Sequence, residues 1–471
     1  MAAMSLFQSE VVAIAGPQSS EVSHFVAHMA ALTQVPLVSF SATDPSLSEY
    51  QYPYFIRLAW SDSIQMSAIA ALIHYYGWRE AVALYIDDDY GQNGVEALRD
   101  LLDNMGSKLT FKASLAAGAD NQTITDVLTH LASMECRVFV VHMHPSMART
   151  VFLAANRLQM MTMGYVWIVT DSITEFLNSN ERDVEFRRAT LGVIGLRMYI
   201  PESLQLFSFL KQRNQETGRT DFQYHAYELL AYESVWMISY ALDRFLKQGN
   251  SLSFVNSSSP SIKNAGTDLA GLKVLKDGDI LLSHVQATNF SGVTGFVNVN
   301  KRGDAEGITF EIVNMVDIVG LQVVGYWIKD TGCTLTPPSH SFTATADGKN
   351  SGQGNLKVVH NTVATTNTTS TDQFKLKEVM WPGNSTKIPR GWVLPENGTP
   401  LSIGVPNKTG YTEFVTTMVD AHGNKVFRGF CIDVFENATL LLPYAIKYKY
   451  VSFGNGSKTP NYNELIDRIA A

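Results

Sequence analysis

The fold is indicated most clearly by residues 80–105, EAVALYIDDDYGQNGVEALRDLLDNM, in which two hydrophobic patterns follow one another. Residues 80–86 form a nearly continuous apolar run, which is typical of a strand buried on both faces of a sheet. Residues 94–105 carry apolar side chains at helical spacing and predict an amphipathic helix. A buried strand joined to a helix by a short polar loop is the unit from which parallel sheets are built.

The same unit recurs on both sides of this segment at intervals of roughly 25–30 residues. We expect strands at 11–16, 36–40, 80–86, 108–115, 136–143, 165–171 and 191–200. We expect helices at 63–76, 94–105, 122–134 and 147–158, and one that opens at Ser19 and Ser20. This alternation predicts an α/β fold of parallel sheets covered by helices on both faces.

The pattern changes after residue 200. Two long helical patterns span 203–214 and 226–247. Three strand-like segments, at 295–300, 308–316 and 321–328, then predict a meander.

Domain boundaries follow from a change in composition. Ser, Thr, Asn or Gly make up 23 of the 41 residues from 331 to 371, as in a flexible linker. The later segments LSIGVP and CIDVFENATLLLPYAIKYKYVSF predict a strand, a helix and a second strand, too few to close a sheet alone. We therefore expect a first domain at 1–330, a linker at 331–379 and the incomplete beginning of a second α/β domain at 380–471.

Composition excludes several classes of protein. Of the 471 residues, 45% are hydrophobic and 17% are charged, which is typical of a globular protein. The length is enough for about two to four domains. The net charge of −8 argues against nucleic acid as a partner, which requires a basic face. Cys136, Cys333 and Cys431 allow at most one disulfide. No apolar run reaches about 18 residues, and no apolar leader follows Met1, so neither a transmembrane helix nor a signal peptide is expected.

Polar side chains follow several expected strands at what would be one edge of the sheet. Ser20, the Ser41-Ala42-Thr43 segment, Tyr90 and Asp171 end or follow expected strands, and Asp62 directly precedes the expected helix at 63–76. In doubly wound sheets, ligands bind at the carboxyl ends of the strands. Hydroxyls at a helix N-terminus suit a carboxylate and acidic side chains suit an ammonium group, so this edge indicates an amino-acid-like ligand. From spacing alone, the alternative that the Ser and Asp residues only cap helices stays open, because both are favoured N-caps.

Patterns for catalysis or metal binding are weak. The sequence has no GxSxG, P-loop or GxGxxG motif, and no nucleophile set or zinc-ligand spacing can be assembled. His142 and His144 flank Met143 at a strand end, but no third ligand follows nearby, so a metal site is not expected there. We therefore expect that the protein is not an enzyme and that it binds no metal and no cofactor.

Nine N-x-Ser/Thr sequons are candidate N-glycosylation sites, which matter only in a secreted chain. They are at Asn121, Asn256, Asn289, Asn367, Asn384, Asn397, Asn407, Asn437 and Asn455. Loops rich in Asn, Ser and Thr generate such sequons without any function, and that alternative stays open.

Several segments resemble, in order, the amino-terminal domain of plant glutamate receptor-like channels. They are VVAIAGPQSS (11–20), PLVSFSATDPSLS (36–48), YPYFIRLAWSD (52–62), GWREAVALYIDDDYGQNG (77–94), RVFVVHM (137–143), GYVWIVTD (164–171), AYELLAYESVW (226–236) and GVTGFVNVNKRGD (292–304). Residues 381–407 and 427–466 resemble the start of the agonist-binding domain of these channels, which shares a G-[FY]-C-[IV]-D run. The resemblance covers essentially all of the chain except 331–379.

The resemblance implies a two-lobed, periplasmic-binding-protein-like domain that senses a small amino-acid-like ligand for a ligand-gated cation channel. Ser20, the 41–43 segment, Asp62, Tyr90 and Asp171 match positions that hold the ligand in the more distant metabotropic receptors. Phe427 matches an aromatic residue that packs over agonist in animal receptors. The family further implies other receptor subunits in a tetramer, at the outer face of the plasma membrane.

The chain also departs from the family pattern. We expect the first strand and helix of the family to be missing before Met1, and the agonist-gripping Arg and the pore to be missing after Ala471. This leaves a soluble, pore-less solute-binding or decoy protein as the alternative to the ligand-sensing portion of a channel.

Overall fold

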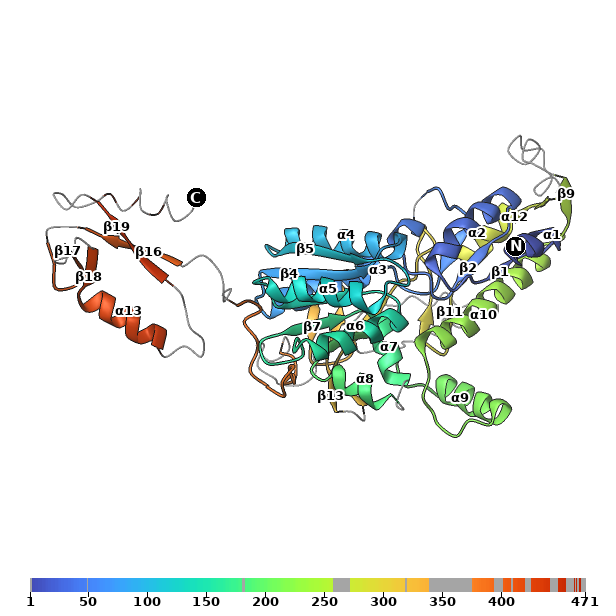
Figure 1. Ribbon diagram of the computed structural model, residues 1–471. Coiled ribbons are helices and arrows are strands. Elements are labelled where there is room, and N and C mark those ends of the chain that lie inside the picture. Colours follow the sequence, from blue (N-terminus) through green and yellow to red (C-terminus); the bar gives the residue numbers. More distant parts are fainter. Residues whose placement is uncertain are drawn as a thin grey trace, which may run out of the picture. The chain divides into compact units, whose positions relative to one another are not determined.

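The computed structural model describes residues 2–48, 50–179, 183–256, 272–317, 320–338, 375–393, 401–407, 410–419, 425–440, 448–454, 461, 463 and 466. The chain divides into two compact units, Met1–Trp392 and Val393–Ala471 (Figure 1). Each unit is described by itself below.

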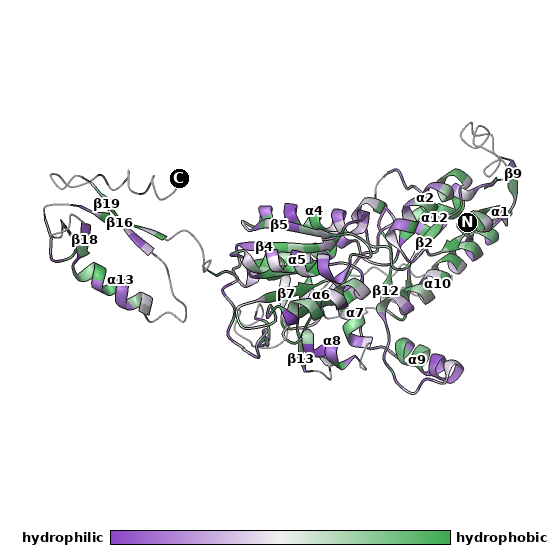
Figure 2. Cartoon of the chain, viewed as in Figure 1, coloured by the Kyte–Doolittle hydropathy of each residue, from purple (hydrophilic) through white to green (hydrophobic). Residues whose placement is uncertain are grey.

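The larger sheet of the first unit has eight strands in the order β15-β14-β13-β8-β7-β6-β4-β5. They span Glu80–Ile86 (β4), Lys108–Leu115 (β5), Val138–His142 (β6), Val166–Val169 (β7), Ile194–Met198 (β8), Thr309–Asp317 (β13), Gly320–Ile328 (β14) and Gly332–Thr334 (β15). Neighbours from β5 to β8 are parallel, whereas β13, β14 and β15 add in antiparallel order. In Figure 2 strands β4 and β7, neither of which lies at an edge of the sheet, are largely green, the hydrophobic colour, as a doubly covered sheet requires.

A second, parallel sheet joins β1 (Ile14–Ala15), β2 (Leu37–Ser39) and β3 (Phe55–Arg57). Helix α10 (Ala226–Lys247) packs on β1 and β2, while α2 (Ser20–Thr33) packs on β2, and α12 (Gly278–Gln286) packs beside α10. We call these elements lobe 1. Short ladders join β9 (Phe254–Asn256) to β10 (Lys273–Leu275) and β11 (Phe290–Ser291) to β12 (Phe296–Val297).

The eight-stranded sheet and its helices form lobe 2. These helices are α3 (Asp62–Tyr75), α4 (Asp89–Asn104), α5 (Asn121–Ser133), α6 (Pro145–Arg157), α7 (Asp171–Ser179) and α8 (Val184–Ala189). Helix α3 packs beside α4, and α6 packs beside α5, α7 and α8. Outside these groups lie α1 (Ala2–Gln8), α9 (Leu204–Thr217) and a 3₁₀ turn at Pro45–Ser48.

Three segments of the chain run between the lobes, and we call them the crossings. The first, residues 58–61, joins β3 to α3, and the second, residues 199–203, leaves β8 on the way to α10. The third, residues 298–308, joins β12 to β13. Every change in the angle between the lobes has to be absorbed at these three places.

The predicted α/β class is confirmed, and several details differ. Residues 295–300 do not join a meander, because the turn at Gly295, with φ 113°, pairs β12 with β11 instead of β13. Helix α4 begins at Asp89 rather than at 94, because the Asp88 side chain accepts a hydrogen bond from the Gly91 N–H at 2.8 Å and caps the helix early. This cap places Tyr90 in the first helical turn.

Residues 375–392 belong to the first unit and pack on the rest of it. Trp381 is 1% exposed, and its ring lies edge-on to Trp78, whose indole N–H donates to the Pro389 carbonyl at 2.8 Å. The Asn314 amide donates to the Met380 carbonyl at 2.9 Å. The domain boundaries at 330 and 380 stay predictions, while the first compact unit continues to Trp392.

Replacing Gly192 with Ala is expected to loosen this packed segment. Gly192 has φ +87°, and an added Cβ would lie 2.2 Å from the Pro382 nitrogen. We expect a loss of about 1–3 kcal/mol in the free energy of unfolding and faster tryptic cleavage after Lys387. Gly118→Ala is the matched control, because Gly118 has φ +81° with nothing within 4 Å. Equal cleavage rates in the two variants would contradict this view.

The second unit has two short sheets and one helix. Its elements are β16 (Leu401–Pro406), β17 (Thr416–Val419), β18 (Lys425–Arg428), α13 (Phe430–Leu440) and β19 (Tyr448–Phe453). Strand β16 pairs with β19 in parallel, and β17 pairs with β18 antiparallel. In neither unit does the described part of the chain contain a helix long and apolar enough to cross a membrane.

Candidate functional site

A cleft of about 540 Å³ lies between the two lobes of the first unit. Lobe 1 lines it with Gln18, Ser19, Ser20, Glu21, Ser41 and Thr43, and lobe 2 lines it with Asp88, Tyr90, His144, Pro145, Ser172, Glu175, Phe176 and Ser179. His225 and Tyr227, at the start of α10, complete the lining. The structure therefore brings four of the predicted residues, Ser20, Ser41, Thr43 and Tyr90, to one cleft.

The lobe 1 wall is held together by its hydroxyl groups. Ser20 Oγ accepts hydrogen bonds from the backbone N–H groups of Thr43 and Asp44 at 3.2 and 3.3 Å. Ser41 Oγ donates to the Gln18 carbonyl at 2.8 Å. Ala42 is fully buried and its N–H donates to Ser39 Oγ at 3.1 Å, so it lies behind the lining. The hydroxyls thus fix the loop that follows β2 against the N-terminus of α2.

On the lobe 2 wall, Tyr90 packs between two histidines. Its ring centroid lies 4.1 Å from that of His142 and 5.6 Å from that of His144, whose ring is nearly parallel to it. Burial lowers the pKa of His142 to about 4, so this imidazole is neutral at physiological pH. His144 is exposed and lies on the cleft side of Tyr90.

Asp62 and Asp171 lie buried behind the cleft lining. Gln65 joins them, because its amide donates to Asp62 Oδ1 at 2.8 Å and its carbonyl accepts from the Asp171 N–H at 2.6 Å. Tyr227 donates from α10 to Asp171 Oδ2 at 2.5 Å and so links lobe 1 to lobe 2. Burial raises the pKa of Asp171 to about 7, and burial and the Asp171 carboxylate raise that of Asp62 well above its usual range.

Sequence reasoning missed Glu175 and His225, which lie at the cleft. Glu175 is 4% exposed, and its Oε2 lies 3.3 Å from His225 Nδ1. Hydrogen bonding to Glu175 raises the pKa of His225, which favours the imidazolium form. The available signal was spacing: Glu175 lies four residues after Asp171, on the same helical face.

The remaining candidate residues lie elsewhere. Phe427, in β18 of the second unit, packs against the small core of Val405, Val415 and Ile432, and its role at an agonist site stays a prediction. Among the described residues, no group of three His, Cys, Asp or Glu side chains could hold a metal ion. Cys136, Cys333 and Cys431 are all free thiols.

Six of the nine sequons fall on described residues. The exposed asparagines are Asn121, Asn256, Asn289, Asn384 and Asn437, whereas Asn407 is partly buried. The other three, Asn367, Asn397 and Asn455, lie outside the described residues. Glycosylation of these residues stays a prediction.

With a cleft between two α/β lobes in place, the class of the protein follows from comparison with known families. A family model described as "Receptor family ligand binding region" matches residues 1–318. The chain belongs to this family of receptor ligand-binding regions.

Particular relatives are plant glutamate receptors. The chain is 36% identical over 473 residues to Glutamate receptor 3.4 of Arabidopsis thaliana, covering 100% of this chain and 46% of that protein. It is 37% identical over 476 residues to Glutamate receptor 3.1 of Oryza sativa subsp. japonica, covering 99% and 48%. Glutamate receptor 2.2 of Arabidopsis thaliana is 34% identical, covering 98% and 47%. The resemblance to plant glutamate receptor-like proteins is thereby confirmed, and the chain spans about half the length of these relatives.

Proposed function

We propose that this chain is the extracellular ligand-sensing portion of a glutamate receptor-like, ligand-gated cation channel, and not an enzyme. Its first unit binds a small amino-acid-like ligand between its lobes. The observation that carries the proposal is the cleft between the lobes, which gathers Ser20, Ser41, Thr43 and Tyr90. The names of the plant relatives support the receptor role.

The chemistry of the cleft suits a zwitterion. The N-terminus of α2 and the Ser19 hydroxyl offer donors to a carboxylate at the lobe 1 wall. Asp88 and Glu175, on the opposite wall, offer carboxylates to an ammonium group. A ligand that touches both walls binds the closed form better than the open form, and so it draws the lobes together.

Closure of the lobes would bias a pore assembled from several subunits. Other receptor subunits, in a tetramer at the outer face of the plasma membrane, are therefore part of the proposal. Phe427 would belong to a second ligand site, in the agonist-binding domain.

Calorimetric titration of the full chain with the common L-amino acids should find at least one that binds with one-to-one stoichiometry. Replacing Ser41 with Trp should abolish this binding, because an indole at the partly buried Ser41 would fill the cleft.

Ser133→Trp is the control for added bulk, because Ser133 is exposed at the end of α5 and lines no part of the cleft. Binding that survives in Ser41→Trp, or the absence of any amino-acid binding at millimolar concentration, would refute the proposed ligand site.

A further inference from the structure

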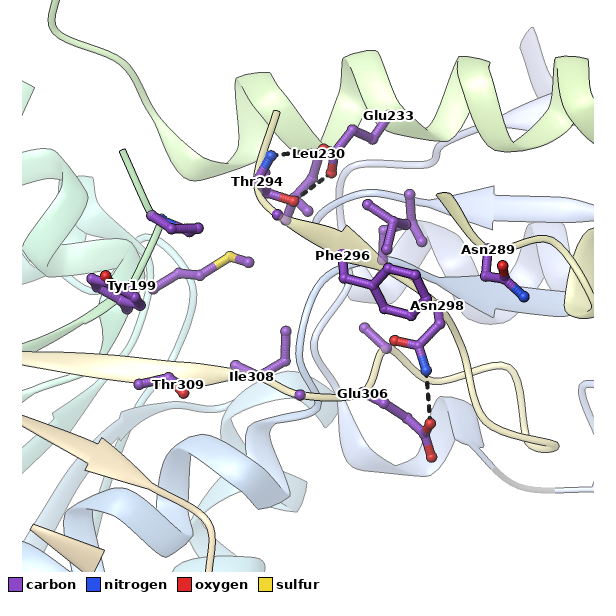
Figure 3. Close-up of a pocket in the computed structure, with 17 residues that line it drawn as sticks. Tyr199, Leu230, Glu233, Asn289, Thr294, Phe296, Asn298, Glu306, Ile308 and Thr309 are labelled. Atoms are coloured by element: carbon purple, nitrogen blue, oxygen red, sulfur yellow. Dashed lines mark hydrogen bonds between the residues drawn. The ribbon is translucent and has the colours of Figure 1, made fainter. Parts of the chain in front are cut away.

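A second cavity, of about 470 Å³, lies apart from the cleft, at the crossings between the lobes. Helix α10 lines it with Leu230 and Glu233, and the segment from Thr294 to Asn298 forms one wall (Figure 3). In the figure, the side chains of Tyr199, Phe296 and Ile308 lie around its central space. Its volume lies within the range of sites for small organic ligands.

All three crossings contribute to the walls of this cavity. Leu58 comes from the first crossing, Tyr199 and Pro201 come from the second, and residues 305–308 come from the third. When the lobes change their angle, these segments move relative to one another and the cavity changes its shape. A ligand held here therefore binds one lobe angle better than another.

Most side chains that line the cavity are apolar, and the charged ones among them are acidic. Leu58, Met198, Leu230 and Val297 are buried around it, and Phe296 and Ile308 are partly buried. The charged residues that line it are Glu233 and Glu306, and no Lys, Arg or His of the described chain joins them.

The two acids differ in their position. Glu233 is fully buried and accepts hydrogen bonds from the Thr294 N–H at 2.8 Å and from the Thr294 hydroxyl at 2.6 Å, which hold the β11–β12 turn on α10. Glu306 is exposed at the mouth, where the Asn298 amide donates to its Oε2 at 2.9 Å (Figure 3). Of the two acids, Glu306 is thus the one that solvent and a ligand can reach.

We infer that this cavity binds a small organic amine with an apolar body, its ammonium group at Glu306 and its body against Phe296, Ile308 and Leu58. An anion of the same shape meets two acids and no cation, so it is rejected. Because the crossings line the cavity, the amine also changes the affinity of the cleft for its ligand. This coupling to the cleft rests on the proposed function, whereas binding of the amine does not.

The probe is 2-phenylethylamine, titrated calorimetrically into the full chain without any amino acid present. The chain is produced without N-glycans, because Asn289 of a candidate sequon also lines the cavity. We expect saturable binding of the amine, weaker binding of the neutral 2-phenylethanol and none of the anion phenylacetate. No saturable binding of the amine at millimolar concentration, or equal binding of phenylacetate, would overturn the inference.

Two variants locate the site. Ile308→Trp should abolish binding by filling the cavity, whereas Ile280→Trp, on the exposed side of α12, should leave it unchanged. Glu306→Gln removes only a charge from an exposed position, so it keeps the test valid if Ile308→Trp does not fold. Glu306→Gln should weaken binding of the amine about fivefold and leave binding of 2-phenylethanol unchanged. The exposed Glu135→Gln is the control and should change the affinity for neither compound. Unchanged amine affinity in Glu306→Gln would overturn the assigned position of the ammonium group.

The coupling has its own readout. At a saturating concentration of 2-phenylethylamine, the Kd of a cleft amino acid should shift by about fivefold or more, and the amino acid should shift the Kd of the amine by the same factor. An unchanged Kd would overturn the coupling. If no amino acid binds at all, the proposed function fails, while the amine titration still decides whether the cavity is a binding site.

Discussion

Replacing Arg57 with Met is expected to destabilise the first unit by about 3–5 kcal/mol, because it removes the only cation paired with the largely buried Asp304 carboxylate among the described residues. The Arg57 side chain is fully buried, and its Nε donates to Asp304 Oδ1 at 2.7 Å. Its Nη1 donates to the Asp44 carbonyl at 2.7 Å, and its Nη2 bonds to the Ser48 hydroxyl. One guanidinium thus ties the loop after β2, which lines the cleft, to the third crossing.

Tryptophan fluorescence during urea unfolding measures this effect selectively. All seven tryptophans lie between residues 60 and 392, so their emission reports only on the first unit. Arg99→Met is the matched control, since Arg99 pairs with Glu96 and Asp100 on the exposed face of α4. The urea midpoint of Arg99→Met should equal that of the unaltered protein. A midpoint for Arg57→Met as high as that of the control would show that the buried pair is dispensable.

The strand-and-helix order of lobe 2 could be predicted because its strands are apolar enough to show in the sequence. Strand β3, Phe55–Arg57, could not, because Arg57 interrupts its apolar run, and this arginine is buried only through its tertiary pairing with Asp304. The candidate site could likewise be predicted only in part. Spacing placed Asp62 before a helix and Asp171 at a strand end, but their burial depends on tertiary packing, in which Gln65 and Tyr227 approach Asp171.

Burial also changes what these acids can do at the cleft. A carboxyl group that is neutral attracts an ammonium ion far less than a carboxylate does. Glu175 and Asp88 line the cleft, whereas Asp62 and Asp171 lie behind it, so the more accessible pair is better placed to meet a cation. The pattern in the sequence pointed to the edge of the sheet at which the cleft lies, while packing decides which carboxylates line that cleft.

The buried Asp171 carboxyl should make the stability of the first unit depend on pH, and Asp171→Asn should remove that dependence. The pKa of Asp171 is raised from 3.8 to about 7 by burial, and Glu175 and the Asp62 carboxyl lie near it. Well below pH 3.8 the carboxyl is neutral in both the folded and unfolded chain, so it costs nothing. Between pH 4 and 7 it ionises only in the unfolded chain, so stability falls as the pH rises.

At pH 8 the Asp171→Asn variant should therefore be more stable than the unaltered protein by up to about 4 kcal/mol, and the difference should vanish near pH 4. The amide oxygen of the substituted side chain can still accept the hydrogen bond from Tyr227, so the link between the lobes is kept. His142, with its lowered pKa, has a dependence of opposite sign, but it is present in both proteins and cancels from the difference. Urea unfolding of both proteins from pH 4 to 8 provides the measurement, with the exposed Asp100→Asn as control. A stability difference that does not grow with pH would mean that Asp171 is ionised in the folded protein, and that it is held as a charged group at the junction of the two lobes.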